Sequence, residues 1–271
     1  MNRKLLTIAA AISAASALTA GDIPALTASL NDAVKAGNND KIIAICTQLR
    51  ADPDFKTHTN GWSKWQMDYR IMLAQLDKLG ARSWENVCRI ADSRPDGAPL
   101  DENQIAARRS SLVFATKDKK LIKTFLDTYK NSTNKGIANS VSRAYSTLGD
   151  QKSAFSHAEA YGLHRQMFNL LNTYSGITTN DNEKIFNVIN IILDDPKANV
   201  DLGFADTVAN KTLINLFVTG KIKKEQFVGT LKKLYRRSYL NLAKDRGRWE
   251  PVVSAIKFGI VNADKIASIG E

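Results

Sequence analysis

The chain has 271 residues, of which 44% are hydrophobic, so it can bury a substantial core. Its six prolines and 15 glycines are too few for long linkers, which argues against a disordered chain. The formal net charge of +11 favours anionic partners such as phospholipid headgroups, acidic glycans, cell-wall polymers or nucleic acid, unless it serves only solubility.

Residues 1–21 have the layout of a secretory signal peptide. Arg3 and Lys4 are basic, and the stretch 5–18 is apolar or small and contains no acidic residue. This stretch is shorter than the roughly 20 apolar residues that span a bilayer. We therefore expect export to the periplasm or the exterior, with an uncleaved anchor as the alternative. The mature chain, 22–271, is expected to be one soluble all-α domain without a transmembrane segment.

Amphipathic helical patterns then follow one another along the chain. Counted from a turn residue, apolar residues recur five, six, nine and twelve positions later, as on a helix with one buried face. Seven turn residues begin this pattern: Gly37, Leu79, Thr116, Gly149, Asn180, Ile222 and Gly247. Pro53, Pro95 and Pro196 each lie 16 residues after a turn, where proline stops a helix.

The segments between these patterns are helical in character as well. Asp101 can cap a helix that runs to about Ala115. The apolar runs 187–193 and 213–218 could be strands, but both lie inside helical patterns. The sequence therefore predicts a helical protein without a convincing series of strands.

An aromatic cluster precedes the second turn residue. Trp62, Trp65 and Tyr69 have the spacing i, i+3, i+7 and lie on one helix face. Such a cluster could stack sugars or anchor a peptide. The spacing is more typical of core packing, which we predict here.

Two stretches have a repeated character. The stretch AYSTLGDQKSAFSHAEAYG resembles the second part of a tetratricopeptide repeat through Ala144, Tyr145, Gly149, Asp150 and Ala154. The stretch AVKAGNNDKIIAICTQLRADP is similar through Ala36, Gly37, Asn38, Leu49 and Pro53. The variable spacing departs from the regular 34-residue period of that family. The resemblance implies an α-solenoid-like array of antiparallel helical hairpins that presents a surface to a protein or peptide. A compact irregular helical bundle is the alternative.

Cys46 and Cys88 are the only cysteines, and both lie nine positions after successive turn residues. Equivalent positions on adjacent hairpins can face each other, so we predict a disulfide, with two free thiols as the alternative. Their separation, without paired histidines, does not fit a zinc site.

No motif for catalysis, phosphate binding or a cofactor is found in the sequence. We therefore predict a non-enzymatic protein that has no metal, no cofactor and no catalytic residue. A secreted hydrolase with two unmarked carboxylates is the third alternative.

The strongest local signal is the basic C-terminal part, 221–249, with ten basic residues and only two acidic ones. Four of them, Lys232, Lys233, Arg236 and Arg237, fall on a helix face away from the core stripe, and Trp249 is a possible stacking neighbour. We therefore predict binding of an anionic partner at these five residues, with a solvated face as the alternative. Because none of the four cations lies on the core stripe, the fold is expected to survive their loss.

The predicted function is that of an exported adaptor or scaffold that binds a protein or peptide partner. The alternative is binding of an anionic envelope ligand, such as a lipid headgroup, an acidic glycan or a wall polymer, through the basic helix. A nucleic-acid partner is not expected.

Overall fold

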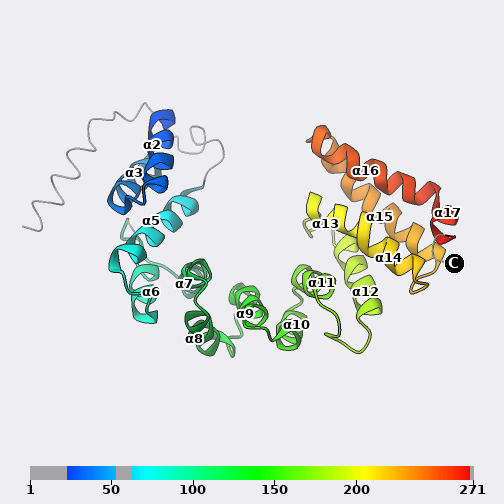
Figure 1. Ribbon diagram of the computed structural model, residues 1–271, viewed down its shortest axis with the longest axis horizontal. Helices are drawn as coiled ribbons and strands as arrows, with labels where there is room; N and C mark the ends of the chain where they lie inside the picture. The colour runs from blue at the N-terminus through cyan, green and yellow to red at the C-terminus, as the bar shows by residue number, and fades with distance from the viewer. Residues whose placement is uncertain (1–22, 53–62, 95, 269–271) are drawn as a thin grey trace, which may run out of the picture. The chain divides into compact units, whose positions relative to one another are not determined.

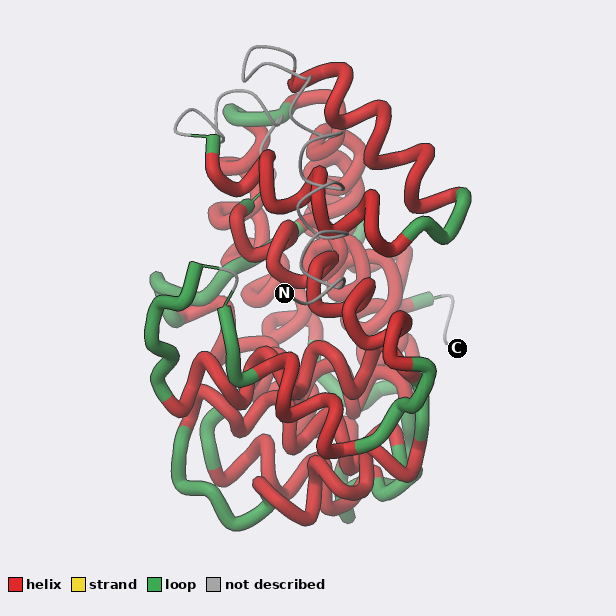
Figure 2. The backbone as a smooth tube through the Cα atoms, turned by 90° about the vertical axis from the view of Figure 1, so that its left-hand side faces the viewer, coloured by secondary structure: helices red, strands yellow, loops and turns green. Residues whose placement is uncertain are grey.

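The computed structural model describes residues 23–52, 63–94 and 96–268, and these ranges contain helices, turns and loops but no strand (Figures 1 and 2). The predicted all-α fold class is confirmed. The runs 187–193 and 213–218 are helical, as expected. Outside the described residues lie the predicted signal peptide, Trp62, Pro53 and Pro95.

The chain divides into two compact units, Met1–Leu148 and Gly149–Glu271. In unit 1 the helices are α2 (Ile23–Lys35), α3 (Asn39–Ala51), α5 (Lys64–Leu79), α6 (Trp84–Ala91), α7 (Glu102–Thr116), α8 (Lys119–Tyr129) and α9 (Lys135–Thr147). In unit 2 they are α10 (Gln151–Ala160), α11 (His164–Thr173), α12 (Asp181–Asp194), α13 (Leu202–Thr207), the π-helix η1 (Val208–Thr212), α14 (Leu213–Val218), α15 (Lys224–Leu242), α16 (Arg246–Val261) and α17 (Ala263–Ala267).

Local sequence explains where several helices begin and end. Asp101 caps α7, because its carboxylate accepts a hydrogen bond from the Gln104 N–H at 2.8 Å and its own N–H donates to Gln104 Oε1 at 3.1 Å. Gly37 and Gly149, two of the predicted turn residues, have φ of 62° and 94°. Glycine adopts this left-handed backbone without the steric cost of a Cβ atom, so both positions end a helix.

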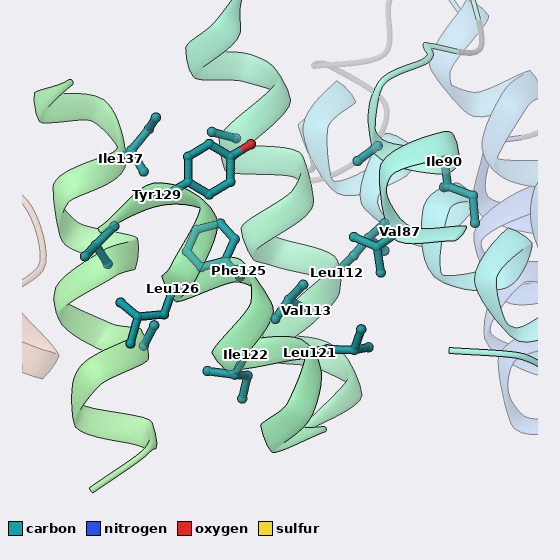
Figure 3. Packing of buried hydrophobic residues seen from close by; sticks show 14 of the residues in the cluster. Val87, Ile90, Leu112, Val113, Leu121, Ile122, Phe125, Leu126, Tyr129 and Ile137 are labelled. Atoms are coloured by element: carbon teal, nitrogen blue, oxygen red, sulfur yellow. The ribbon is translucent and has the colours of Figure 1, made fainter. Parts of the chain in front are cut away.

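The helices of unit 1 pack as neighbouring hairpins. Helix α5 packs against α7, and α7 against α9, so the first helices of successive hairpins lie side by side. Helix α6 contacts both α5 and α7, and α8 contacts both α7 and α9. Figure 3 shows the core that results, in which Val113 of α7, Phe125 of α8 and Ile137 of α9 belong to one cluster of buried side chains. Each hairpin therefore buries its apolar face partly against the next one.

The two cysteines are free thiols and do not form the predicted disulfide. Cys46 is fully buried in the cluster that α2, α3 and α5 form, whereas Cys88 lies on α6 and is partly exposed. Helix α5 packs against both α3 and α6. The two cysteine-bearing helices, α3 and α6, are not among the closely packed helix pairs, although both border one shallow hollow.

Unit 2 is organised around α15, which packs along α16 and also contacts α12, α13, α14 and α17 (Figure 1). Gly259 lies where α15 and α16 meet closely, since a Cβ atom there would stand 2.8 Å from Leu231 Cδ1. The rings of Phe217 and Phe227 stack with centroids 4.5 Å apart and join α14 to α15. None of the helices in the described ranges has the length and apolar character needed to cross a bilayer.

Candidate functional site

The four cations predicted to act together on α15 do not share one environment. Lys233 donates to Asp194 Oδ2 at 2.7 Å and to Asn190 Oδ1 at 3.1 Å, both on α12. Arg237 donates to the backbone carbonyls of Asp195 at 2.7 Å and of Ala198 at 2.5 Å. Both side chains therefore fasten α15 to the C-terminal end of α12.

Lys232 and Arg236 lie on the other side of the same helix, where they are exposed and form no ion pair with the described residues. Trp249, the predicted stacking neighbour, is only 8% exposed and belongs to the core of unit 2. The expectation that all four cations can be lost without cost to the fold therefore conflicts with the contacts of Lys233 and Arg237. Whether any of these five residues binds a ligand remains a prediction.

A different surface combines the features of a binding site. A shallow groove of about 280 Å³ runs over three neighbouring helices of unit 1. It is lined by Trp65 and Tyr69 of α5, Ser111, Phe114 and Ala115 of α7, and Arg143 of α9. We call these six residues the aromatic groove. Its floor exists only because α5, α7 and α9 lie side by side.

Arg143 gives the aromatic groove its charge. Its guanidinium carbon lies 4.1 Å from the centroid of the Phe114 ring, which is a cation–π contact. Phe114 is held in turn by Phe125 of the core, with ring centroids 6.2 Å apart. Arg143 is exposed and pairs with no carboxylate among the described residues. The Phe114 ring therefore holds the planar guanidinium in place, and its N–H groups can donate to an acceptor on a ligand.

Trp65 is the residue that sequence reasoning assigned to the wrong environment. Its side chain is 42% exposed, and Tyr69 is half-buried, although both were predicted to pack in the core. Met72, one turn further along the same side of α5, is buried. This side of α5 thus begins at the surface and enters the core only along the second half of the helix. The combination of an exposed tryptophan and an arginine without an ion pair marks this groove in the structure. The sequence does not show this combination, because Arg143 lies far from Trp65 along the chain.

A buried ionic network ties α5 to α3 and α7. Asp68 of α5 pairs with Arg50 of α3 at 2.5 Å and with Arg108 of α7 at 3.6 Å. Arg108 is 2% exposed and donates to the carbonyls of Ala91 at 2.7 Å and Ser93 at 2.6 Å. Burial lowers the pKa of Arg108, and the charge of Asp68 opposes that effect. Since both α5 and α7 supply groove residues, this network is what positions them.

Two of the larger hollows contain polar groups that already have partners. The hollow near Arg109, about 640 Å³, is lined by a guanidinium that Asp92 and Tyr129 bind at 2.8 Å and 3.0 Å. The hollow beside the π-helix, about 440 Å³, contains Asp181, whose carboxylate accepts from the backbone N–H of Thr178 at 2.6 Å. The aromatic groove differs from both because its cation lies over an aromatic ring and has no ion pair within the described residues.

No cluster of three His, Cys, Asp or Glu side chains suited to a metal ion occurs in the part of the chain that the structure describes. Comparisons with protein-family models, with curated proteins and with solved structures give no match to this chain.

Proposed function

We propose that the chain is an exported, non-enzymatic binding protein whose first unit holds a peptide segment of a partner protein in the aromatic groove. The observation that carries this proposal is that two exposed side chains line the same groove: the guanidinium of Arg143, which stacks on Phe114 and forms no ion pair within the described residues, and the indole of Trp65. Export is inferred from the signal-like residues 1–21.

The residues of the groove favour a particular kind of segment. A guanidinium binds a carboxylate through two parallel hydrogen bonds, so Arg143 suits an Asp or Glu side chain or a chain terminus. The neighbouring rings of Trp65, Tyr69 and Phe114 offer apolar faces to an aromatic or aliphatic side chain. The groove is shallow and spans three helices, whereas small-molecule sites are usually enclosed. An extended peptide with an acidic residue beside an apolar one is therefore the ligand that fits.

A selection from random peptides displayed on phage tests the proposal, because it assumes no partner. We expect peptides enriched on the wild-type chain to carry Asp or Glu next to an aromatic or aliphatic residue. The affinity of individual peptides is then measured by calorimetry. Replacing Arg143 by Gln should weaken them about tenfold or more, the cost of losing a charge-assisted hydrogen bond.

Arg82→Gln is the matched control, since Arg82 is also exposed in unit 1 and lies outside the aromatic groove. This variant should bind the selected peptides as the wild type does. Trp65→Ala should weaken binding as well. Absence of any enriched peptide, or equal affinity for the wild type and Arg143→Gln, would overturn the proposal.

A further inference from the structure

The most exposed apolar side chains of the described residues gather on two helices of unit 2. Tyr239 and Leu240 of α15 are 53% and 65% exposed, and Phe258 and Val261 of α16 are 62% and 81% exposed. No other large hydrophobic side chain in the described ranges exceeds 44%. Exposed apolar side chains on a protein surface are usually scattered singly, so four on two neighbouring helices indicate a site that another molecule covers.

Cations without partners accompany these side chains. Lys232 and Arg236 of α15 and Lys257 of α16 are exposed, and none forms an ion pair within the described residues. Lys257 lies 5.6 Å above the Tyr235 ring, which places it on the side of α16 that borders α15. Of the acids nearby, Glu250 pairs with Arg246 at 3.4 Å and Asp264 with Lys224 at 2.5 Å, whereas Glu225 near the start of α15 is exposed and forms no ion pair within the described residues. The three exposed cations outnumber this one acid.

The exposed sides of the two helices adjoin where Lys257 of α16 lies over the Tyr235 ring of α15. Helices α15 and α16 pack together along their length, with Leu231 against Gly259 (Figure 1). The buried faces carry residues such as Leu234 and Ile256. With 3.6 residues per turn, Arg236 and Phe258 lie opposite those buried faces. We call these two adjoining exposed sides the α15–α16 ridge, defined by Lys232, Arg236, Tyr239, Leu240, Lys257, Phe258 and Val261.

We propose that the α15–α16 ridge docks onto the surface of an anionic lipid bilayer, which goes beyond peptide binding in unit 1. Apolar side chains gain by entering the boundary between headgroups and acyl chains, while Lys and Arg keep their charges at the phosphates. An acidic glycan or wall polymer would use the cations and leave Phe258 and Val261 bare. A second copy of the chain would bring like charges together, which disfavours self-association.

Flotation with vesicles tests the proposal on the full-length mature chain. The probe is a phosphatidylcholine vesicle with one third phosphatidylglycerol, compared with phosphatidylcholine alone, at about 50 mM and about 500 mM salt. We expect at least tenfold stronger binding to the anionic vesicles at low salt. Each cation near such a surface adds about fivefold in affinity, so K232Q/R236Q/K257Q should lose on the order of a hundredfold.

Apolar and control variants separate a membrane from other partners. L240S/F258S/V261S keeps every charge and should lose at least tenfold in vesicle binding. Ile191→Ser, on α12 of the same unit, and K119Q/K120Q/K135Q, in unit 1, should bind as the wild type does, because these residues are exposed elsewhere. Circular dichroism checks that each variant is folded.

Three results would overturn the proposal. One is vesicle binding that no ridge variant weakens. Another is that neither the wild type nor L240S/F258S/V261S binds vesicles while both bind polygalacturonate equally well. That result would mean that the ridge binds an acidic glycan. The third is a dimer, measured by ultracentrifugation, that the apolar variant dissociates. Arg143→Gln should leave vesicle binding unchanged, so failure of the membrane proposal and failure of the peptide proposal are distinguishable.

Discussion

Two adjacent arginines of α15 allow a sharp test of how the structure uses its charges. Arg236 and Arg237 carry the same charge on the same helix, and sequence patterning assigned both to one surface. In the structure Arg237 contacts the end of α12, whereas Arg236 is exposed. Arg237→Gln should therefore destabilise unit 2, and Arg236→Gln should not.

The size of the effect follows from the contacts of Arg237. Its guanidinium donates to three backbone carbonyls, those of Leu193 at 3.3 Å, Asp195 at 2.7 Å and Ala198 at 2.5 Å. Leaving the partner of a charged hydrogen bond unsatisfied costs about 1.5–3 kcal/mol, and losing a cation at a helix C-terminus costs about 0.3–1 kcal/mol. Water can reach some of these carbonyls, so we expect a loss of about 2 kcal/mol rather than the full sum. Arg236→Gln should change the free energy of unfolding by less than about 0.5 kcal/mol.

Urea unfolding followed by circular dichroism measures both variants, and hydrogen exchange of residues 193–200 reports the local effect. Exchange there should accelerate in Arg237→Gln alone. Arg237→Lys should recover only part of the loss, since an ammonium lacks the planar fork that reaches several carbonyls. Equal unfolding midpoints for Arg236→Gln and Arg237→Gln would refute the assignment of Arg237 to α12.

Further predictions concern buried groups. Burial raises the pKa of the Cys46 thiol to about 12, so at pH 8 iodoacetamide should label Cys46 about a thousandfold more slowly than an ordinary thiol, and Cys88 should be labelled first. Mass spectrometry should find two free thiols after unfolding. Asp68→Asn removes the carboxylate that pairs with the buried Arg108, so the free energy of unfolding in urea should fall by about 3 kcal/mol. An unchanged unfolding midpoint would contradict a structural role for the network of Arg50, Asp68 and Arg108. Burial lowers the pKa of His157, so the fold favours the neutral ring; stability should decline as the pH falls below about 6.5, and His157→Gln should make the unfolding midpoint less sensitive between pH 7 and pH 5.5.

The helices could be predicted from the sequence because their signals are local. The φ of Gly149 is 94°, as its place between two helical patterns indicated, and Asp101 caps α7 through Gln104, three residues away. The apolar positions recur at helical spacing within each segment, so helix identity does not depend on distant partners. The all-α class follows from such short-range evidence alone.

The exposure of Trp65 could not be predicted, because it depends on which side of α5 the neighbouring helices cover. Helices α3, α6 and α7 all pack against α5, and the periodicity of one helix does not reveal where their cover ends. The absence of the expected disulfide has the same origin. Cys46 and Cys88 occupy equal sequence offsets, yet α5 packs against both of the helices that carry them.

The basic C-terminal part shows why a run of charge cannot be equated with a binding surface. Of its ten basic residues, five bind acids or backbone carbonyls, namely Lys224, Lys233, Arg237, Arg246 and Arg248. The others, Lys221, Lys223, Lys232, Arg236 and Lys244, are exposed and form no ion pair within the described ranges. Among these, Lys232 and Arg236 lie on the face that carries Tyr239 and Leu240. The number of cations can be read from the sequence, but which of them a backbone acceptor such as the Asp195 carbonyl binds cannot. Binding at this end of the chain should therefore follow the few cations that have exposed apolar neighbours, rather than the net charge.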